Sequence, residues 1–179
     1  TAPWITIAAP AGSTGSGAVN YTVAANADTN ARSATIDVAG QLFTVNQAAA
    51  ACTFSIVPAS APATAAGGPG SFNVTANGAN CAWTATTTAP WITIAAPAGS
   101  TGSGAVNYTV AANADTNPRS ATIDVAGQLF TVNQAAAACT FSLAPASASA
   151  TAAGGPGTFN VTANGTNCSW TATTADSAP

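Results

Sequence analysis

Apolar and polar residues alternate along the chain in short runs, which are separated by Gly, Pro, Asn and Ser. A period of two is typical of β-strands with one buried face, and no segment keeps the 3.6-residue period of an amphipathic helix. Within the stretch 52–134 the alternating runs predict seven strands, at 52–56, 71–75, 81–86, 92–94, 106–110, 121–125 and 130–132. The sequence therefore predicts an all-β fold, an antiparallel β-sandwich with polar outer faces.

Turn signals separate these runs at two places. Asn77-Gly78 precedes the third predicted strand, and Ala126-Gly127 lies between the last two. A two-residue connection that contains glycine favours a tight β-hairpin. We expect Ala126-Gly127 to form such a hairpin turn.

The pattern occurs twice, because residues 1–87 recur as residues 88–174. The two copies differ at seven positions: Ala31/Pro118, Ile56/Leu143, Val57/Ala144, Pro62/Ser149, Ser71/Thr158, Ala79/Thr166 and Ala82/Ser169. A repeat of this fidelity indicates an array of similar structural units, or part of one.

Only 4% of the residues are charged, and the chain has no Lys, His, Met or Glu. Nucleic-acid binding needs clustered Lys or Arg, so a net charge of −3 excludes a nucleic-acid partner. No apolar run approaches the ~18 residues that span a membrane. General acid–base catalysis usually needs His, Lys or a tuned carboxylate pair. We therefore expect neither an enzyme nor a cofactor.

Four cysteines occur at one repeated spacing, 29 residues apart within each copy. The spacing predicts two disulfides, Cys52–Cys81 and Cys139–Cys168, formed in an oxidising compartment. A metal site is the alternative, but the chain has no His and no CxxC pair. Because both members of each pair lie on the apolar face of their own strands, the bridge is expected to cross the core.

The aromatic residues divide into two groups by strand face. Those predicted in the core follow a cysteine by two positions or alternate with valines: Trp83, Trp170, Tyr21 and Tyr108. Trp4 and Trp91 stand after a proline at a strand start, on the opposite face from the isoleucines. These two are the candidates for stacking on a glycan, with the capping of one end of the sandwich as the structural alternative.

Asn26-x-Asp28-x-Asn30, repeated at 113–117, has a spacing similar to that of oxygen ligands in calcium loops. One carboxylate and no closing Glu favour a turn held by Asx side chains instead, and we expect no metal there. Arg119 is expected to pair with Asp115 or Asp124 across this turn.

One family has these motifs in this order. The first half of its pattern is Cys52-x-Phe-x-Ile, Ala66-Gly-Gly-Pro-Gly-Ser-Phe-Asn-Val-Thr75 and Cys81-Ala-Trp83; the second half is Pro90-Trp-Ile-Thr-Ile94, Gly102-Ser-Gly104, Val106-Asn-Tyr108, Arg119, and Val125-Ala-Gly-Gln128 followed by Val132-Asn-Gln134. The chain resembles the BACON domain over essentially its whole length. The resemblance implies an immunoglobulin-like β-sandwich of bacterial secreted or surface proteins, in a family named for a proposed carbohydrate-binding role and often serving as a spacer.

The family's order of motifs sets the frame of the repeat. It predicts that 48–134 is a complete sandwich, that 1–47 is the C-terminal half of another, and that 135–179 is an N-terminal half. Each half would need its apolar face covered. The cover could come from further repeats in a longer array of one polypeptide or from the complementary half of another copy; the short Ala-rich linkers make a contact between the two halves of one chain difficult. We therefore expect an extracellular or cell-surface structural protein that forms a fibre, filament or stalk, with further copies of itself as partners. A carbohydrate-binding or adhesin module of a secreted bacterial protein is the alternative, with glycans as partners.

Overall fold

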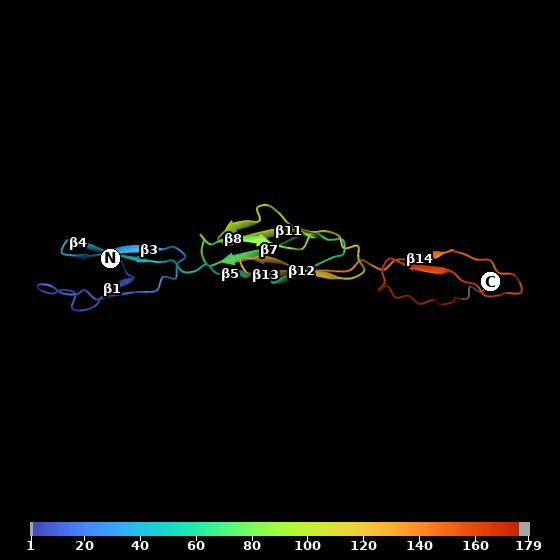
Figure 1. Cartoon of the computed structure of the whole chain (residues 1–179), viewed down its shortest axis with the longest axis horizontal. Coiled ribbons are helices and arrows are strands. Elements are labelled where there is room, and N and C mark those ends of the chain that lie inside the picture. Colours follow the sequence, from blue (N-terminus) through green and yellow to red (C-terminus); the bar gives the residue numbers. More distant parts are fainter. Residues whose placement is uncertain (1, 176–179) are drawn as a thin grey trace.

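The computed structural model describes residues 2–175 and arranges them as three β-structured parts in a row (Figure 1). Residue 1 and residues 176–179, which end the two predicted half-domains, lie outside the described residues. We call the three parts the N-terminal flank (2–47), the central sandwich (52–134) and the C-terminal flank (139–175). No helix occurs in the described part of the chain, and so none that could cross a membrane.

The central sandwich consists of two packed sheets. The five-stranded sheet has the order β10-β8-β12-β13-β6, and the four-stranded sheet has the order β5-β7-β11-β9. Its strands have these bounds: β5 Phe54–Ile56, β6 Ser60–Ala63, β7 Gly68–Ala76, β8 Ala82–Thr86, β9 Ile92–Ile94, β10 Gly99–Thr101, β11 Gly104–Val110, β12 Arg119–Val125 and β13 Gln128–Gln134. The all-β sandwich prediction is confirmed.

Alternate side chains of these strands fill the space between the sheets. At the centre, Phe72 from β7 stacks on Phe130 from β13, with ring centroids 4.0 Å apart. Tyr108 from β11 tilts against both rings. Burial raises the pKa of the Tyr108 phenol above its ordinary value because the surroundings disfavour the charged form. The apolar face of the predicted strands is thus the core of the sandwich.

Two strands of the central sandwich were not predicted from the sequence pattern. β6 and β10 are short edge strands of small and polar residues, so they show no alternation of apolar positions. β6 also pairs parallel to β13, whereas an antiparallel sandwich was predicted. The chain leaves the four-stranded sheet after β5, at Pro58, and continues along the other sheet as β6. Proline supplies no N–H to a strand ladder, which suits this change of sheet.

The predicted hairpin turn joins β12 to β13. Ala126 and Gly127 have φ values of 50° and 83°, so both central residues are left-handed, as in a type I′ turn. The backbone N–H of Gly127 donates to Oδ1 of Asp124 at 3.1 Å. The N-terminal flank repeats this hairpin with Ala39 and Gly40.

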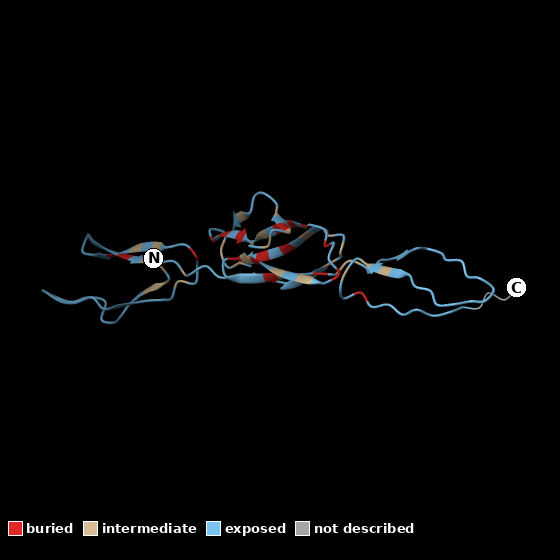
Figure 2. Cartoon of the chain, turned by 45° about the vertical axis from the view of Figure 1, so that its right-hand side comes forward, coloured by how far each residue is buried: buried red, intermediate tan, exposed pale blue. Residues whose placement is uncertain are grey.

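Each flank carries smaller, two-stranded sheets. The N-terminal flank has two antiparallel pairs and the C-terminal flank has one. Their strands are β1 Ile5–Ile7, β2 Tyr21–Val23, β3 Arg32–Val38, β4 Gln41–Gln47, β14 Phe141–Ala144 and β15 Asn160–Ala163. Figure 2 shows that exposed residues dominate both flanks, while buried residues concentrate in the central sandwich.

Equivalent side chains therefore differ in exposure between copies. Trp83 and Tyr108, predicted in the core, are each 5% exposed. Their copies Trp170 and Tyr21 are 55% and 37% exposed, which contradicts the prediction that all four are core residues. Tyr21 packs only against the β3–β4 pair, through Phe43 at 5.8 Å between ring centroids, and no copy of β7 covers its other side as β7 covers Tyr108. Trp170 follows β15 outside any strand, and no sheet lies over it in the described part of the chain.

Candidate functional site

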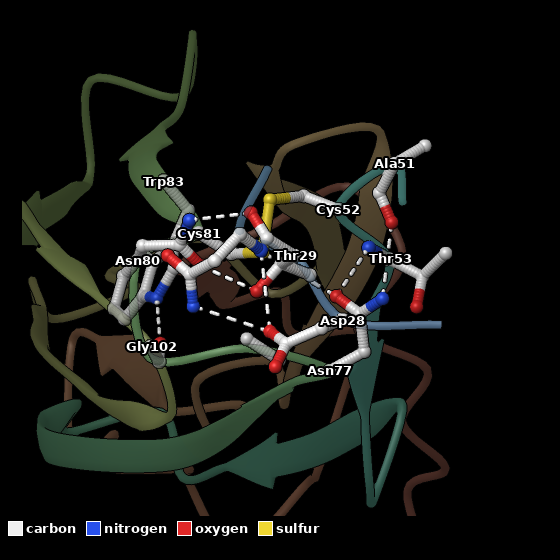
Figure 3. Close-up of a disulfide and its surroundings, with 12 residues drawn as sticks. Asp28, Thr29, Ala51, Cys52, Thr53, Asn77, Asn80, Cys81, Trp83 and Gly102 are labelled. Carbon is white, nitrogen blue, oxygen red and sulfur yellow. Dashed lines mark hydrogen bonds between the residues drawn. A yellow bond between two sulfur atoms is a disulfide. The ribbon is translucent and has the colours of Figure 1, made fainter. Parts of the chain in front are cut away.

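The structure contains both predicted disulfides, Cys52–Cys81 and Cys139–Cys168. Their placement differs from the prediction of a bridge across the core. Cys81 is fully buried, but Cys52 is exposed and lies ahead of β5, so the bridge closes one end of the sandwich. Figure 3 shows this end, where the linker from the N-terminal flank arrives.

Asn77 fixes the end of that linker. Its Oδ1 accepts a hydrogen bond from the Thr53 N–H at 2.9 Å, and its Nδ2 donates to the Ala51 carbonyl at 3.0 Å. The disulfide sulfur of Cys81 lies 3.4 Å from the same Oδ1. Residues 51–53, at the end of the linker and the start of the central sandwich, are therefore held against the turn 77–81 by hydrogen bonds and by the disulfide.

The loop 26–30 of the N-terminal flank is folded by its own side chains. Asn26 Oδ1 accepts from the Asp28 N–H, and Asp28 Oδ1 accepts from the Asn30 N–H, both at 3.2 Å. Asn26 Nδ2 donates to the carbonyls of Asn30 and Ala48 at 2.9 Å. These oxygens serve Asx turns. Among the described residues no group of three His, Cys, Asp or Glu side chains could hold a metal.

This loop docks on the turn 77–81 of the central sandwich. The Thr29 hydroxyl bonds to Asn80 Oδ1, and Asn80 Nδ2 donates to the Thr29 carbonyl at 2.6 Å (Figure 3). Thr29 is only 6% exposed. Any side chain at Gly78 would overlap Thr29. The contact is thus polar, buried and closely fitted, and we call the loop 26–30, the linker 48–51 and the turn 77–81 together the joint.

A second joint connects the central sandwich to the C-terminal flank with the same contacts. Asn167 Nδ2 donates to the Thr116 carbonyl at 2.6 Å, as Asn80 does to Thr29. The linker N–H of Ala137 donates to the Asp115 carbonyl at 2.8 Å, the distance found in the first joint between Ala50 and Asp28. Gly165 takes the place of Gly78. The joint is therefore a property of the repeat.

Sequence reasoning did not find the joint. It identified the turn at Asn77-Gly78 and the Asx residues of the loop 26–30, but as separate local features. The contact between Thr29 and Asn80 joins residues 51 positions apart that belong to different structural parts. No periodicity or spacing marks such a pair, although the internal repeat of both residues was visible.

The two glycan candidates lie beneath arginine side chains. The Arg119 guanidinium lies over the Trp91 ring at 4.5 Å from its centroid, and Arg32 lies over Trp4 at 4.6 Å. Trp91 is half-buried and packs against the core. Arg119 also donates from Nε to Gln134 Oε1 at 2.8 Å. A cation–π contact of this kind takes up the ring face that a sugar would need.

The predicted pairing of Arg119 with an aspartate is wrong. Its Nη2 donates to the carbonyls of Ala111 and Ala112, both at 3.1 Å. The expected partner Asp124 instead supports the hairpin turn, and Asp115 belongs to the second joint. The guanidinium reaches from β12 of one sheet to the carbonyls that follow β11 and the ring that precedes β9 in the other sheet.

An apolar hollow opens on the N-terminal flank. It has a volume of about 210 Å³ and is lined by Val19, Tyr21, Ile36, Val38 and Phe43. The copies of these residues in the central sandwich lie in its core. On the C-terminal flank, Leu143 and Phe159 line a second hollow, of about 430 Å³. Each flank therefore presents core-type side chains to the surroundings.

Fold and site define a disulfide-bonded all-β protein of the sandwich type. The chain belongs to the BACON family, whose model, described as "Putative binding domain, N-terminal", matches residues 1–48 and 82–135. The two matched segments are consistent with repeated copies of one domain.

Solved structures that are similar to the chain include two of known identity. One is a Bacteroides ovatus GH5 xyloglucanase in complex with a XXXG heptasaccharide, at 21% identity and a TM-score of 0.41, covering 48% of this chain and 19% of that chain. The other is the surface layer protein SbsC, domains 4–9, at 11% identity and a TM-score of 0.36, covering 70% of this chain and 21% of that chain. This chain thus spans about a fifth of each. No curated protein matches it.

Proposed function

We propose that the protein is an extracellular structural repeat protein whose β-sandwich domains stack head to tail into a fibre, filament or surface stalk. One observation carries the proposal: the same joint occurs twice, with matching hydrogen bonds on both sides of the linker. A joint encoded in the repeat gives each added domain the same orientation relative to the one before it. The division into 1–47, 48–134 and 135–179 is part of this proposal.

The joint has the features of a stiff connection. Thr29 and the linker are held by separate groups, Asn80 for the loop and Asn77 for the linker, so rotation about the linker would break both sets of bonds. Each hydrogen bond that the rotation exchanges for one to water costs ~0.5–1.5 kcal/mol. Two disulfides suit an oxidising compartment, which supports an extracellular location.

Changing Gly78 tests the joint. We expect Gly78→Val to displace Thr29, because a side chain there overlaps it, and to free the linker. Small-angle X-ray scattering should then show a broad distribution of interatomic distances in place of the profile of one extended particle. Ala79→Thr is the matched control, since the second copy already carries Thr166 at this position. Equal profiles for both variants would contradict a rigid joint.

Electron microscopy addresses the fibre directly. Negative-stain images of the native material should show filaments, or rows of beads at a regular spacing. Images that contain only discrete monomers would remove the fibre part of the proposal.

Carbohydrate binding is the second candidate function, favoured by the family's description as a binding domain. Trp91 is the residue to test, and its stacking with Arg119 favours a structural role. We therefore expect that any glycan-array signal of the wild-type chain is retained by Trp91→Ala. A signal that is lost with Trp91→Ala and kept with Leu129→Ala, a change at an exposed apolar residue, would favour the carbohydrate-binding function instead.

A further inference from the structure

We propose that residues 139–175 of a second copy of the chain cover the apolar face of residues 2–47 and complete a sandwich like the one at 52–134. The inference rests on the proposed head-to-tail function and names the segment that forms the contact between subunits. The two flanks lie at opposite ends of the central sandwich, so the segment reaches the face from another molecule (Figure 1).

The central sandwich shows which segment fits. There, β5 to β8 of residues 52–86 complete the core with β9 to β13 of residues 92–134. Residues 139–173 repeat 52–86, and residues 5–47 repeat 92–134. The flanks therefore carry the two complementary halves of a core that the same chain already builds once.

The core aromatic contacts are split between the flanks. Phe72 stacks on Phe130 in the central sandwich. Their copies Phe159 and Phe43 are 55% and 53% exposed, one in each flank. In the proposed contact, Phe159 of one copy stacks on Phe43 of the next, and Tyr21 packs against both as Tyr108 does.

Strand lengths support the same pairing. β11 spans Gly104–Val110 because β7 pairs with its full length. Its copy β2 is limited to Tyr21–Val23, the part that pairs with β1. In the other flank, β15 likewise covers only Asn160–Ala163, opposite β14. The copies of residues 17–20 and 155–159 are paired in the central sandwich, whereas within residues 2–175 these positions lack the equivalent neighbouring strand.

Glycines mark where the partner would approach. A side chain at Gly70 would overlap Tyr108, and one at Gly104 would press on the Trp83 ring. Their copies Gly157 and Gly17 have no such neighbour and no left-handed backbone that requires glycine. Close approach by Tyr21 and Trp170 of adjacent copies supplies the reason for glycine at these positions.

Charge raises no obstacle to the contact. Residues 139–175 contain no charged side chain, so the covering segment brings no ion of its own into the contact. One half contacts a different half, which makes the interface heterologous, and such contacts extend into filaments when they do not close a ring.

Sedimentation velocity of the full chain over a range of concentrations tests the inference. We expect the chain to assemble as its concentration rises. Phe43→Asp should raise the concentration required for assembly at least tenfold. Leu42→Asp is the matched control, because Leu42 and its copy Leu129 are exposed even in the complete sandwich (66% and 55%). Circular dichroism should show that both variants keep the central sandwich. A wild-type chain that stays monomeric, or equal assembly of both variants, would overturn the inference.

Mixing defines the direction of the contact. Phe43→Asp damages only the N-terminal face, and Phe159→Asp damages only the C-terminal segment. Each variant alone should be monomeric, whereas an equimolar mixture should form 1:1 dimers and no longer species. A mixture without dimers would also overturn the inference. The joints lie within one chain, so they can be tested without assembly. If the chain is monomeric but its scattering profile is that of one extended particle, the contact between copies is wrong and the proposed stacking of domains is still supported.

Discussion

Replacing Phe130 with alanine is expected to destabilise the central sandwich by about 3 to 5 kcal/mol. Phe130 is fully buried, stacks on Phe72 and contacts Tyr108, so its removal loses apolar burial and leaves a cavity between the two sheets. The measurement is urea unfolding of the full chain, followed by tryptophan fluorescence, to which the buried Trp83 and the half-buried Trp91 of the central sandwich contribute. A loss of this size is a large fraction of the net stability of a domain.

Phe43→Ala is the matched control, since the repeat places the same residue in the same hairpin of the N-terminal flank. Phe43 is half-exposed, so at concentrations where the chain is monomeric its replacement should change the central unfolding transition by less than about 0.5 kcal/mol. A similar loss for both variants would show that the flank and the central sandwich unfold as one unit.

Much of the fold follows from local patterns in the sequence. Alternation placed Phe72, Val74 and Trp83 on a buried face, and all three are core residues. The glycine of Ala126-Gly127 favoured a tight hairpin, since it adopts the left-handed backbone without a steric cost. These predictions succeeded because a single strand or turn determines each of them.

Features that depend on distant parts of the chain could not be predicted. Trp170 has the sequence surroundings of Trp83, yet it is exposed, because burial depends on a second sheet and not on the strand itself. Arg119 finds carbonyls and the Trp91 ring in place of an aspartate, since the fold brings β9 and β12 together at one end. The joint belongs to the same class of long-range contacts.

The position of the disulfide connects the stability of the sandwich to the geometry of the array. Cys52 follows the linker directly, and Cys81 ends the turn that holds Thr29 through Asn80. The bridge therefore ties together the two chain segments that form one side of the joint. A change at this bridge should affect both the folding of the domain and the orientation of its neighbour.

Replacing both Cys52 and Cys81 with alanine is expected to lower the stability of the central sandwich by about 3 to 4 kcal/mol. The bridge closes a loop with a sequence separation of 29, and opening it increases the entropy of the unfolded chain by that amount in the loop-closure model. Alanine is preferred to serine because Cys81 is fully buried and a hydroxyl there would lack a partner. Urea unfolding gives the change in stability.

The same variant should also loosen the joint, because Ala51 and Thr53 are then held on the turn only by Asn77. Hydrogen exchange at the Thr53 N–H should become faster, and the scattering profile of the full chain should broaden. The matched control replaces Cys139 and Cys168, which close the equivalent bridge in the C-terminal flank. That variant should leave the central unfolding transition and the exchange at Thr53 unchanged. If both double variants lower the central transition equally, the bridge acts through the whole chain and not through its own domain.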